Sequence, residues 1–372
     1  MKVMTVVGTR PEVIRLSRVT ALLDESVEHV LVHTGQNWDY QLNGIFFDEM
    51  GIRPPDHALN VDTSSLGAVL GDTLRKTEEV LRLERPDAFL VLGDTNSSIS
   101  ALVARRMHVP VYHMEAGNRC FDHNVPEETN RRFVDHIADF NLVYTEHARR
   151  NLLAEGIHPR QIMLTGSPLR EVLDFYRSEI DRSQVLTRLG LDVGKYFLVS
   201  AHREENVDSP TRLTSLVEGL AAVKEAWRLP ILVSTHPRTK IRLEQLGSSV
   251  DLSGISFHEP FGFFDYNSLQ MHARCVLSDS GSISEEASIL GFPAITLRNS
   301  IERPEALEFG TIMLASFAPE VLLDAIREIT RVSRSSTNSI PVEYEIADTS
   351  RRVVRFIGST VPVADIWLGL RS

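Results

Sequence analysis

The chain has 372 residues, about twice the usual 100 to 200 of one domain, so roughly two domains are expected. Hydrophobic residues make up 42% and charged residues 24%, an ordinary globular composition that excludes wholesale disorder. With 39 basic and 50 acidic residues the net charge is −11, so neither nucleic acid nor an anionic membrane is expected as a partner without a strong local basic patch.

The cysteine content and the apolar runs indicate the cellular location of the protein. Cys120 and Cys275 are too few for a disulfide framework, and Arg10 interrupts the N-terminus before a signal-sized apolar run develops. The longest apolar runs, such as 88–93 and 288–297, fall short of the roughly 18 residues that a membrane helix needs. We therefore expect a soluble protein located in the cytoplasm.

Short β-branched runs alternate with longer helical stretches, a pattern typical of parallel sheets covered by helices. In the first half of the chain, strands are expected at 3–7, 29–34, 88–93, 109–113, 141–145 and 161–166. In the second half they are expected at 196–202, 230–236, 255–258, 275–280 and 293–298. The pattern predicts an α/β protein with two parallel-sheet domains.

A charged, helical-looking segment without a strand, 167–195, separates the two sets of strands and is the expected linker. The domains are therefore placed at 1–175 and 176–372. A Ser-rich loop is expected at 332–341, followed by an amphipathic helix at 348–358 that could pack back on the first domain.

Ligands of open parallel sheets bind beyond the carboxyl ends of the strands, so the residues that follow each strand are the site candidates. The first strand leads into GTRPE (8–12), where Pro11 suits the first turn of a helix. Arg10 and Arg15 can point at an anion there. Arg15 can equally be a solvated helix residue.

Two later strands of the first half end in acidic motifs. Asp94 lies in GDTNSS (93–98), where an ordinary helix N-cap is the simpler explanation. Glu115 lies in HMEAGNR (113–119), two residues before a candidate hinge at Gly117. An acid at this position is unusual unless it is paired, which favours a functional role for Glu115.

The motif PEETNRR (126–132) follows, with a proline at a helix start and two acids, Glu127 and Glu128, in the first turn. Stabilisation of the helix dipole alone would explain one of these acids. The second acid leaves room for a functional role.

Histidines follow two strands of the second half. His202 lies in SAHREEN (200–206) and His236 in STHP (234–237). A lone histidine is more often structural, but two at successive strand ends make a site more plausible.

A loop of small residues opens a helix in SDSGSISEEA (278–287), and the backbone N–H groups of such a loop can hold a diphosphate. Glu286 lies one turn into that helix, where its carboxylate can accept both hydroxyls of a ribose. Stabilisation of the helix dipole would explain this acid as well.

The sequence contains no GxGxxG, GxxxxGK[ST] or HExxH motif, and its histidines lack zinc-site spacing. Neither a nicotinamide cofactor nor a metal is therefore expected.

Seven motifs together resemble those of the non-hydrolysing UDP-N-acetylglucosamine 2-epimerase family, in family order and over nearly the whole chain. They are GTRPE (8–12), GDTNSS (93–98), HMEAGNR (113–119), PEETNR (126–131), SAHREEN (200–206), SDSGSISEEA (278–287) and RNSIERPEA (298–306). The resemblance implies two Rossmann-like domains of the glycosyltransferase-B type, an active site in the cleft, UDP bound mainly by the second domain, no cofactor, and a homodimer.

The same resemblance implies roles for individual residues. Asp94, Glu115 and Glu127 would be the acid/base carboxylates, and His202 would complete the catalytic set by contacting the diphosphate or the nearby ring. The residues implied to bind UDP are Arg10, Arg15, Ser280, Gly281, Ser282, Glu286 and Arg303.

Three segments differ from the UDP-N-acetylglucosamine enzymes: Arg15 replaces a lysine, Gln36 and Asn37 replace a glutamine–histidine segment, and EAGNRCFD (115–122) replaces EAGLRTGD. These features are similar to the branch that converts UDP-2-acetamido-2,6-dideoxy-L-talose to UDP-N-acetyl-L-fucosamine for capsule and O-antigen sugars. The run 118–120 is therefore expected to face the sugar. A UDP-N-acetylglucosamine 2-epimerase, a sugar transferase of the same architecture and a non-catalytic UDP-sugar sensor are the alternatives.

Overall fold

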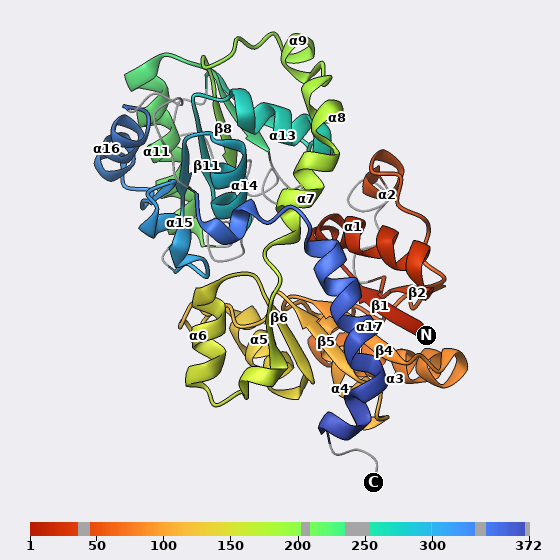
Figure 1. Cartoon of the computed structure of the whole chain (residues 1–372). Helices are drawn as coiled ribbons and strands as arrows, with labels where there is room; N and C mark the ends of the chain where they lie inside the picture. Colours follow the sequence, from red (N-terminus) through yellow and green to blue (C-terminus); the bar gives the residue numbers. More distant parts are fainter. Residues whose placement is uncertain (36–44, 202–208, 235–252, 299, 332–339, 369–372) are drawn as a thin grey trace. The chain divides into compact units, whose positions relative to one another are not determined.

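The computed structural model describes residues 1–35, 45–201, 209–234, 253–298, 300–331 and 340–368. The chain forms two compact units, shown in Figure 1. The N-terminal unit comprises Met1–Phe175 and Glu345–Ser372, and the C-terminal unit comprises Tyr176–Tyr344. The second domain, predicted at 176–372, therefore ends earlier than predicted, because the C-terminal helix belongs to the N-terminal unit. The sequence had allowed for this helix to pack back on the first domain.

The described part of the N-terminal unit contains a seven-stranded parallel sheet in the order β3-β2-β1-β4-β5-β6-β7. Its strands are β1 Lys2–Val7, β2 Glu28–His33, β3 His57–Ala58, β4 Ala88–Leu92, β5 Val111–Met114, β6 Phe140–Val143 and β7 Ile162–Leu164. Each strand expected in this half is present. The two-residue strand β3 was not predicted, because it is too short to show a periodic pattern.

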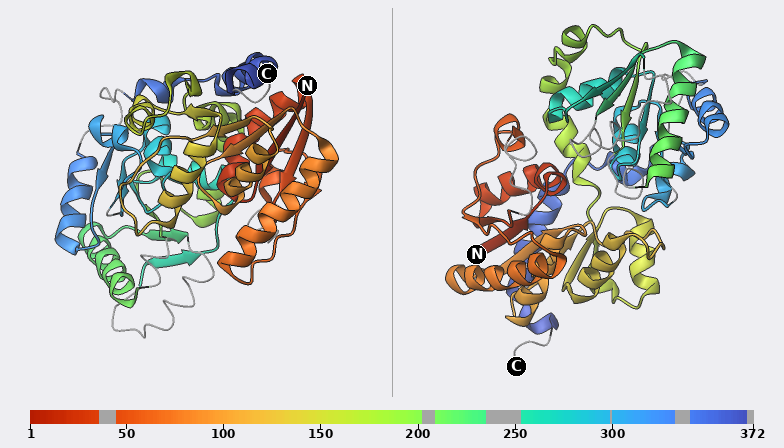
Figure 2. Two further views of the ribbon diagram at one scale, coloured as in Figure 1. Left: turned by 90° about the horizontal axis from the view of Figure 1, so that it is seen from below. Right: turned by 180° about the vertical axis from the view of Figure 1, so that it is seen from behind.

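Helices cover both faces of this sheet (Figure 2). They are α1 Arg10–Ser26, α2 Ile45–Glu49, α3 Leu66–Glu84, α4 Ala101–Arg106, α5 Pro126–Ile137, α6 Glu146–Ala154, α7 Pro168–Phe175 and α17 Thr349–Leu368, with 3₁₀ turns η2 Asn96–Ser100 and η3 Pro159–Gln161. Side chains of β1 alternate between the two faces: Val3 and Val7 pack with α1 and α17, whereas Met4 and Val6 pack with α3 and α4. Both faces are therefore buried, as expected for a parallel sheet.

The C-terminal helix α17 is longer than the predicted segment 348–358, although Gly358 and Pro362 normally weaken or break a helix. Its apolar face packs beside α1, which the figure shows as neighbouring ribbons (Figure 1). The Tyr112 hydroxyl in β5 lies 2.6 Å from Thr360 Oγ1 on this helix. Tertiary packing thus outweighs the low helix propensity of these two residues.

The described part of the C-terminal unit contains a six-stranded parallel sheet in the order β10-β9-β8-β11-β12-β13. Its strands are β8 Phe197–Ser200, β9 Ile231–Ser234, β10 Ile255–His258, β11 Cys275–Ser278, β12 Ala294–Thr296 and β13 Ile312–Leu314. Its helices are α8 Arg177–Asp181, α9 Val185–Leu189, α11 Pro210–Trp227, α13 Phe263–His272, α14 Ile283–Leu290, α15 Pro304–Glu308 and α16 Pro319–Ile329, followed by the 3₁₀ turn η4 Val342–Glu345.

Alternation in β8 repeats the arrangement of the first sheet. Phe197 and Val199 pack with α11 and α16, whereas Leu198 and Tyr196, which directly precedes the strand, pack with α13 and α14. The prediction of an α/β fold with two parallel-sheet, Rossmann-like domains is therefore confirmed. Among the described helices, none combines the length and the apolar character that crossing a membrane requires.

Candidate active site

Three neighbouring strands of the N-terminal unit end at the same edge of the sheet, since β1, β4 and β5 are adjacent and parallel. GTRPE follows β1, GDTNSS follows β4 and HMEAGNR spans the end of β5. The first two motifs are about 80 positions apart in the sequence and the last two about 20, yet all three lie at one edge of the sheet. This is the edge where ligands of parallel sheets bind.

Glu12 connects the ends of β1 and β4. Its carboxylate accepts hydrogen bonds from the backbone N–H groups of Gly8 (3.0 Å) and Thr9 (2.7 Å) and from the hydroxyls of Thr95 (3.0 Å) and Ser97 (2.5 Å). Burial raises the pKa of Glu12 above its ordinary value, while these hydrogen bonds oppose the rise. Glu12 was not among the predicted site residues, although its position at the end of the motif GTRPE could have indicated it.

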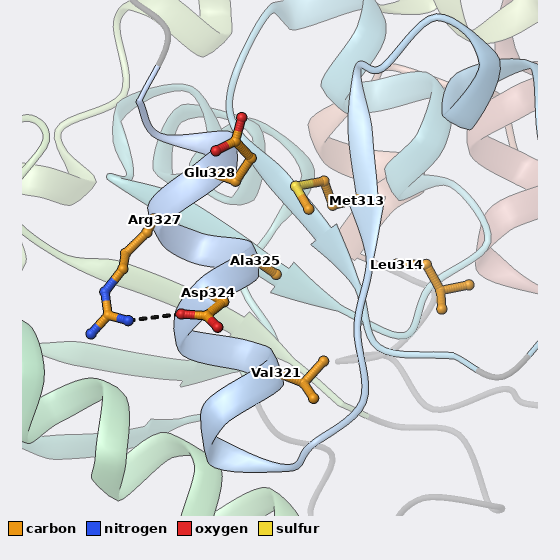
Figure 3. Close-up of a pocket in the computed structure, with 7 residues that line it drawn as sticks. All are labelled: Met313, Leu314, Val321, Asp324, Ala325, Arg327 and Glu328. Atoms are coloured by element: carbon orange, nitrogen blue, oxygen red, sulfur yellow. Dashed lines mark hydrogen bonds and ion pairs between the residues drawn. The ribbon is translucent and has the colours of Figure 1, made fainter.

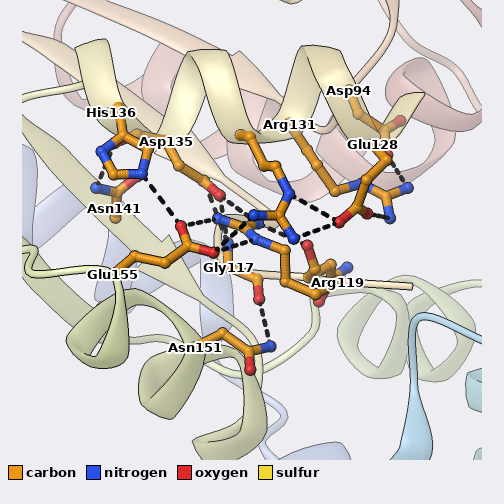
Figure 4. Close-up of polar contacts among 12 residues, drawn as sticks. Asp94, Gly117, Arg119, Glu128, Arg131, Asp135, His136, Asn141, Asn151 and Glu155 are labelled. Carbon is orange, nitrogen blue, oxygen red and sulfur yellow. Dashed lines mark hydrogen bonds and ion pairs between the residues drawn. The ribbon is translucent and has the colours of Figure 1, made fainter. Parts of the chain in front are cut away.

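Asp94 follows β4 and does not cap a helix. Thr95 occupies the N-cap position of η2, and its side chain accepts from Ser97 N. The Asp94 carboxylate instead accepts two hydrogen bonds from Arg131 on α5, at 3.0 Å from Nε and 2.6 Å from an η-nitrogen (Figure 4). Arg131 therefore fixes the orientation of Asp94.

Glu115 follows β5 in a left-handed backbone conformation, with φ of 65°. Such a conformation is costly for a residue with a Cβ and often marks a functional position. The Glu115 side chain lies beside the glycine that precedes Asp94, since a Cβ added to Gly93 would be 3.5 Å from Glu115 Oε2. The Asn118 amide lies 3.5 Å from the other carboxylate oxygen.

The two acids at the start of α5 differ in their surroundings. Glu128 is fully buried and bonded to Arg131 (3.0 Å), Arg132 (2.9 Å) and Cys120 N (3.1 Å). Burial raises its pKa, but the bonds from Cys120 and the two arginines outweigh burial and hold the pKa below its ordinary value. Glu127 is half-buried, and the described part of the chain holds no hydrogen bond or ion pair of its carboxylate. Glu128 is thus held by the surrounding structure, whereas Glu127 has no such bond among the described residues.

The helix that bears Glu127 is attached to the Asp94 corner. One turn further along α5, the Asn130 amide donates to the Asp94 carbonyl (2.9 Å) and to Asn96 Oδ1 (3.3 Å). Arg131 adds its bonds to the Asp94 carboxylate. The three predicted carboxylates, Asp94, Glu115 and Glu127, therefore lie on elements that bond or pack directly against one another.

The two predicted arginines of the N-terminal unit lie on α1. Arg10 is half-buried at the start of the helix. Arg15 is 5% exposed, so it is not the solvated helix residue considered above, and its guanidinium carbon lies 5.9 Å from the ring centroid of Tyr144, just beyond β6. Both belong to the edge where the strands end.

A buried charge network surrounds Arg119 (Figure 4), which closely follows the turn 115–117, here called the Glu115 turn. Arg119 donates to Asp135 (2.7 Å) and forms a two-pronged contact with Glu155, at 2.8 and 2.6 Å. Its side chain is fully buried. The expectation that Arg119 faces the sugar is therefore wrong, because two carboxylates and the Asn118 carbonyl take up its guanidinium.

Cys120, the next residue of the same run, points to protein groups as well. Its sulfur lies 3.3 Å from Glu128 Oε2, and burial raises the pKa of the Cys120 thiol. Of the run 118–120, Asn118 is the residue that stays next to a predicted catalytic carboxylate.

In the C-terminal unit, the loop of Ser280, Gly281 and Ser282 joins β11 to α14. The hydroxyls of Ser280 and Ser282 lie 3.0 Å apart, and Ser282 N donates to Ser280 Oγ at 3.4 Å. Glu286 follows on α14, and its carboxylate accepts a 2.6 Å hydrogen bond from the buried Gln270 amide. Gln270 was not predicted, because its position on α13 carries no motif.

Arg303 contacts the backbone of the loop 280–282. It donates to the Gly281 carbonyl (3.2 Å) and pairs with the buried Glu285 (2.9 Å). Its predicted role in UDP binding is thus accompanied by a structural one. Close by, Arg298 and Glu302 form a buried two-pronged ion pair at 2.5 and 2.6 Å.

Several predicted positions, His202, His236, Gln36 and Asn37, lie outside the described residues. A hollow on the C-terminal unit, between β13 and α16, is lined by residues of these two elements (Figure 3). These are Met313, Leu314, Val321, Asp324, Ala325, Arg327 and Glu328. None of the predicted site residues lines it.

Comparison with known proteins gives one consistent family. A family model described as UDP-N-acetylglucosamine 2-epimerase matches residues 21–358. The structure of UDP-N-acetylglucosamine 2-epimerase from Rickettsia bellii is 43% identical and covers 100% of both chains, with a TM-score of 0.93. That of the UDP-GlcNAc 2-epimerase from Methanocaldococcus jannaschii, in complex with UDP-GlcNAc and UDP, is 35% identical over 96% of this chain and 100% of its own, with a TM-score of 0.89.

A relative with another substrate in its name is nearly as similar. The UDP-2,3-diacetamido-2,3-dideoxy-D-glucuronate 2-epimerase of Pseudomonas aeruginosa is 33% identical over 88% of this chain and 92% of its own length. Because the family model covers most of the chain and the relatives align over nearly all of it, this protein belongs to the non-hydrolysing UDP-N-acetylglucosamine 2-epimerase family and is an isomerase of that class.

Proposed function

We propose that the chain inverts C2 of UDP-2-acetamido-2,6-dideoxy-L-talose to give UDP-N-acetyl-L-fucosamine, a sugar donor for surface polysaccharide. The observation that carries the reaction type is the placement of Asp94, Glu115 and Glu127 on adjoining elements at the carboxyl edge of one sheet. Family membership supports the same chemistry.

The reaction needs acids and bases because the C2 hydrogen of a 2-acetamido sugar is not next to a carbonyl carbon. Direct removal of that proton would leave an unstabilised carbanion. In the proposed route, a base takes the C2 proton while the C1–O bond to UDP breaks, which leaves a 2-acetamidoglycal. UDP then adds back to C1 and an acid delivers a proton to the opposite face of C2, so no electrons are gained or lost overall.

Two carboxylates or more suit this route, since one group must take a proton on one face and another must give one on the other. The different surroundings of the three carboxylates fit a division of labour: Arg131 holds Asp94, and Glu127 has no bond within the described residues. His202 is proposed to contact the departing diphosphate.

The C-terminal unit is proposed to bind UDP. The loop of Ser280, Gly281 and Ser282 opens a helix, and its N–H groups and hydroxyls suit phosphate oxygens. Glu286, oriented by Gln270, suits the ribose hydroxyls. Arg303 donates to the Gly281 carbonyl of this loop. Arg10 and Arg15, on the N-terminal unit, are also proposed as UDP-binding residues.

The choice of the 6-deoxy sugar rests on residues that differ from the glucosamine enzymes and stand near the carboxylates. Asn118, whose amide is 3.5 Å from Glu115, is the best-placed of these in the described part of the chain. Rejection of the glucosamine nucleotide would come from mispaired polar contacts, because a pocket for a methyl group alone discriminates weakly against an added hydroxyl.

The second candidate substrate is UDP-N-acetylglucosamine, which is favoured by the names of the Rickettsia bellii and Methanocaldococcus jannaschii relatives. Each nucleotide is incubated separately with the enzyme in deuterated water and followed by NMR. Deuterium at C2 together with the epimer supports a 2-epimerase and excludes both a sugar transferase and a non-catalytic sensor, since neither opens that C–H bond. A specificity constant for UDP-N-acetylglucosamine equal to or above that for the L-talose nucleotide would overturn the 6-deoxy proposal and leave the reaction type intact.

A further inference from the structure

Asp135 lies on α5 under the ends of β4 and β5, fully buried, where it would touch neither substrate nor reacting atoms. We infer that Asp135 is a positioning residue for the reaction: by holding the Gly117 amide, Arg119 and His113 together, it keeps the Glu115 carboxylate in its working orientation. The inference rests on the acid/base role proposed for Glu115.

The Glu115 turn needs such support because its backbone is strained. Glu115 has φ of 65°. A left-handed conformation is costly for a residue with a Cβ and persists only where the surroundings impose it. Gly117, with φ of 80°, has no Cβ and adopts this region without that cost. Released from its partners, this turn would relax toward an ordinary conformation and move the carboxylate.

Asp135 supplies the restraint directly. Both of its carboxylate oxygens lie 3.2 Å from Gly117 N, two residues after Glu115, and Oδ2 accepts from Arg119 at 2.7 Å. The opposite side of Gly117 is held by Asn151, which donates to the Gly117 carbonyl at 3.0 Å. The position itself is closely packed, since a Cβ added to Gly117 would lie 2.4 Å from the Ala148 carbonyl oxygen. Gly117 was a candidate hinge from the sequence, but in the structure its N–H and carbonyl are both hydrogen-bonded and it is closely packed.

The same carboxylate reaches the neighbouring strand through His113. The ring atom Nδ1 of His113 lies 2.9 Å from Asp135 Oδ1 without forming a hydrogen bond, and Nε2 donates to the Gly93 carbonyl at 2.8 Å. Gly93 immediately precedes Asp94. Asp135 is therefore bonded to the turn that carries Glu115, and it contacts the ring that is bonded to the turn before Asp94.

The matched control is Asp139, a second buried aspartate just beyond the end of α5. It accepts from Val111 N at 2.9 Å and pairs with Arg105 at 3.1 Å. It therefore holds the start of β5 rather than its catalytic end. Asp139→Asn should lower the unfolding temperature without changing turnover for each UDP-binding site.

The test compares Asp135→Asn with Asp139→Asn, using the nucleotide sugar that the wild-type enzyme turns over faster. UDP-binding sites are counted by calorimetry, so that kcat refers to folded enzyme. Asp135→Asn should lower kcat about tenfold or more, while KM and the affinity for UDP change little, because a small misplacement of a reacting group is costly. A kcat within twofold of wild type would overturn the inference.

A double-mutant cycle with Glu115→Gln separates positioning from general damage. If Asp135 acts through Glu115, Asp135→Asn should lower the residual activity of Glu115→Gln by less than about twofold. Equal losses in both backgrounds would overturn the positioning role only. Wild-type turnover in Glu115→Gln alone would instead overturn the role proposed for Glu115, and this inference with it.

Asp135→Asn leaves the buried Arg119 short of one partner, which can prevent folding. Should it yield no UDP-binding sites, the double variant Asp135→Asn/Arg119→Gln takes its place, since it removes both charges of that pair. The same fall in kcat and the same non-additivity with Glu115→Gln are expected. Wild-type kcat in the double variant would overturn the inference.

Discussion

The two units arrange charge at their strand ends in different ways. In the N-terminal unit, acidic side chains follow the strands: the buried Arg131 orients Asp94, and the buried Arg119 pairs with Asp135 near the Glu115 turn. In the C-terminal unit, small residues form the loop after β11, and Arg303 pairs with a buried acid behind it. Carboxylates suit proton transfer, whereas a loop of N–H groups and hydroxyls suits an anion, so the difference supports the proposal that one unit carries the chemistry and the other binds the nucleotide.

The largest expected effect tests the acid/base role proposed for the N-terminal unit. Asp94→Asn, Glu115→Gln and Glu127→Gln should each lower kcat by at least about 10²-fold, the lower range for a lost acid/base group. The affinity for UDP should change far less, because the residues proposed to bind the nucleotide lie mainly on the other unit. Steady-state kinetics and calorimetry measure the two quantities.

The matched control for Glu127 is Glu146, also an acid in the first turn of a helix of the same unit. Glu146→Gln should retain wild-type turnover, since Glu146 pairs with Arg149 on its own helix. Near-wild-type turnover in any of the three carboxylate variants would remove that residue from the mechanism.

The next effect tests the buried framework of the C-terminal unit. Glu302→Gln should destabilise the protein by about 3–5 kcal/mol, because it leaves the buried Arg298 without its charged partner. Replacing both residues, as Arg298→Met/Glu302→Leu, should recover much of that loss. Denaturant unfolding measures both changes; equal stability of Glu302→Gln and wild type would show that the pair is not needed.

Acid should weaken the N-terminal unit through His33 at the end of β2. Burial lowers the pKa of His33 from 6.5 to about 4, and its Nδ1 accepts the Gly35 N–H at 2.9 Å, which favours the neutral ring. The unfolded chain takes up the proton below pH 6.5 and the folded chain only below about pH 4. Stability is therefore lost as the pH falls through this window, by about 3 kcal/mol.

His33→Gln lacks this titration, so its stability should fall by about 3 kcal/mol less than that of wild type between pH 7 and 4. Urea unfolding at several pH values gives the comparison. Parallel pH profiles for the two proteins would show that His33 is not held neutral.

The smallest expected effect tests the UDP binding proposed for the C-terminal unit. Glu286→Ala should weaken UDP binding about tenfold, a loss in the range of a charge-assisted hydrogen bond. Binding of 2′-deoxyuridine diphosphate should weaken less, because one of the proposed hydroxyl partners is absent. Gln270→Leu should show the same pattern more weakly, since Gln270 acts by orienting Glu286. Unchanged UDP affinity in Glu286→Ala would rule out its placement at the ribose.

Much of the site follows from motifs that end strands. Asp94, Glu115 and Glu127 could be chosen because each stands in a short polar segment directly after a strand or at a helix start. Gln270 and Asp135 could not, because nothing in their local sequence distinguishes them from other helix residues. Glu12 ends the motif GTRPE, but the motif does not show which residues Glu12 contacts. Their importance arises from partners far along the chain, such as Ser97 for Glu12, 85 positions away.

The amino-acid sequence by itself determined the α/β class, most of the strands, a helix start with Pro11 in its first turn for α1, and the start of α5 at Pro126, because periodicity and helix-start signals are local. Only the tertiary structure decided that Arg119 points inward to Asp135 and Glu155, and that the last helix belongs to the first unit. The reason is physical: β5 lies between β4 and β6, so the burial and pairing of Arg119 depend on which segments the strand order brings together. The length of α17 likewise depends on its packing against α1, which local propensity does not encode.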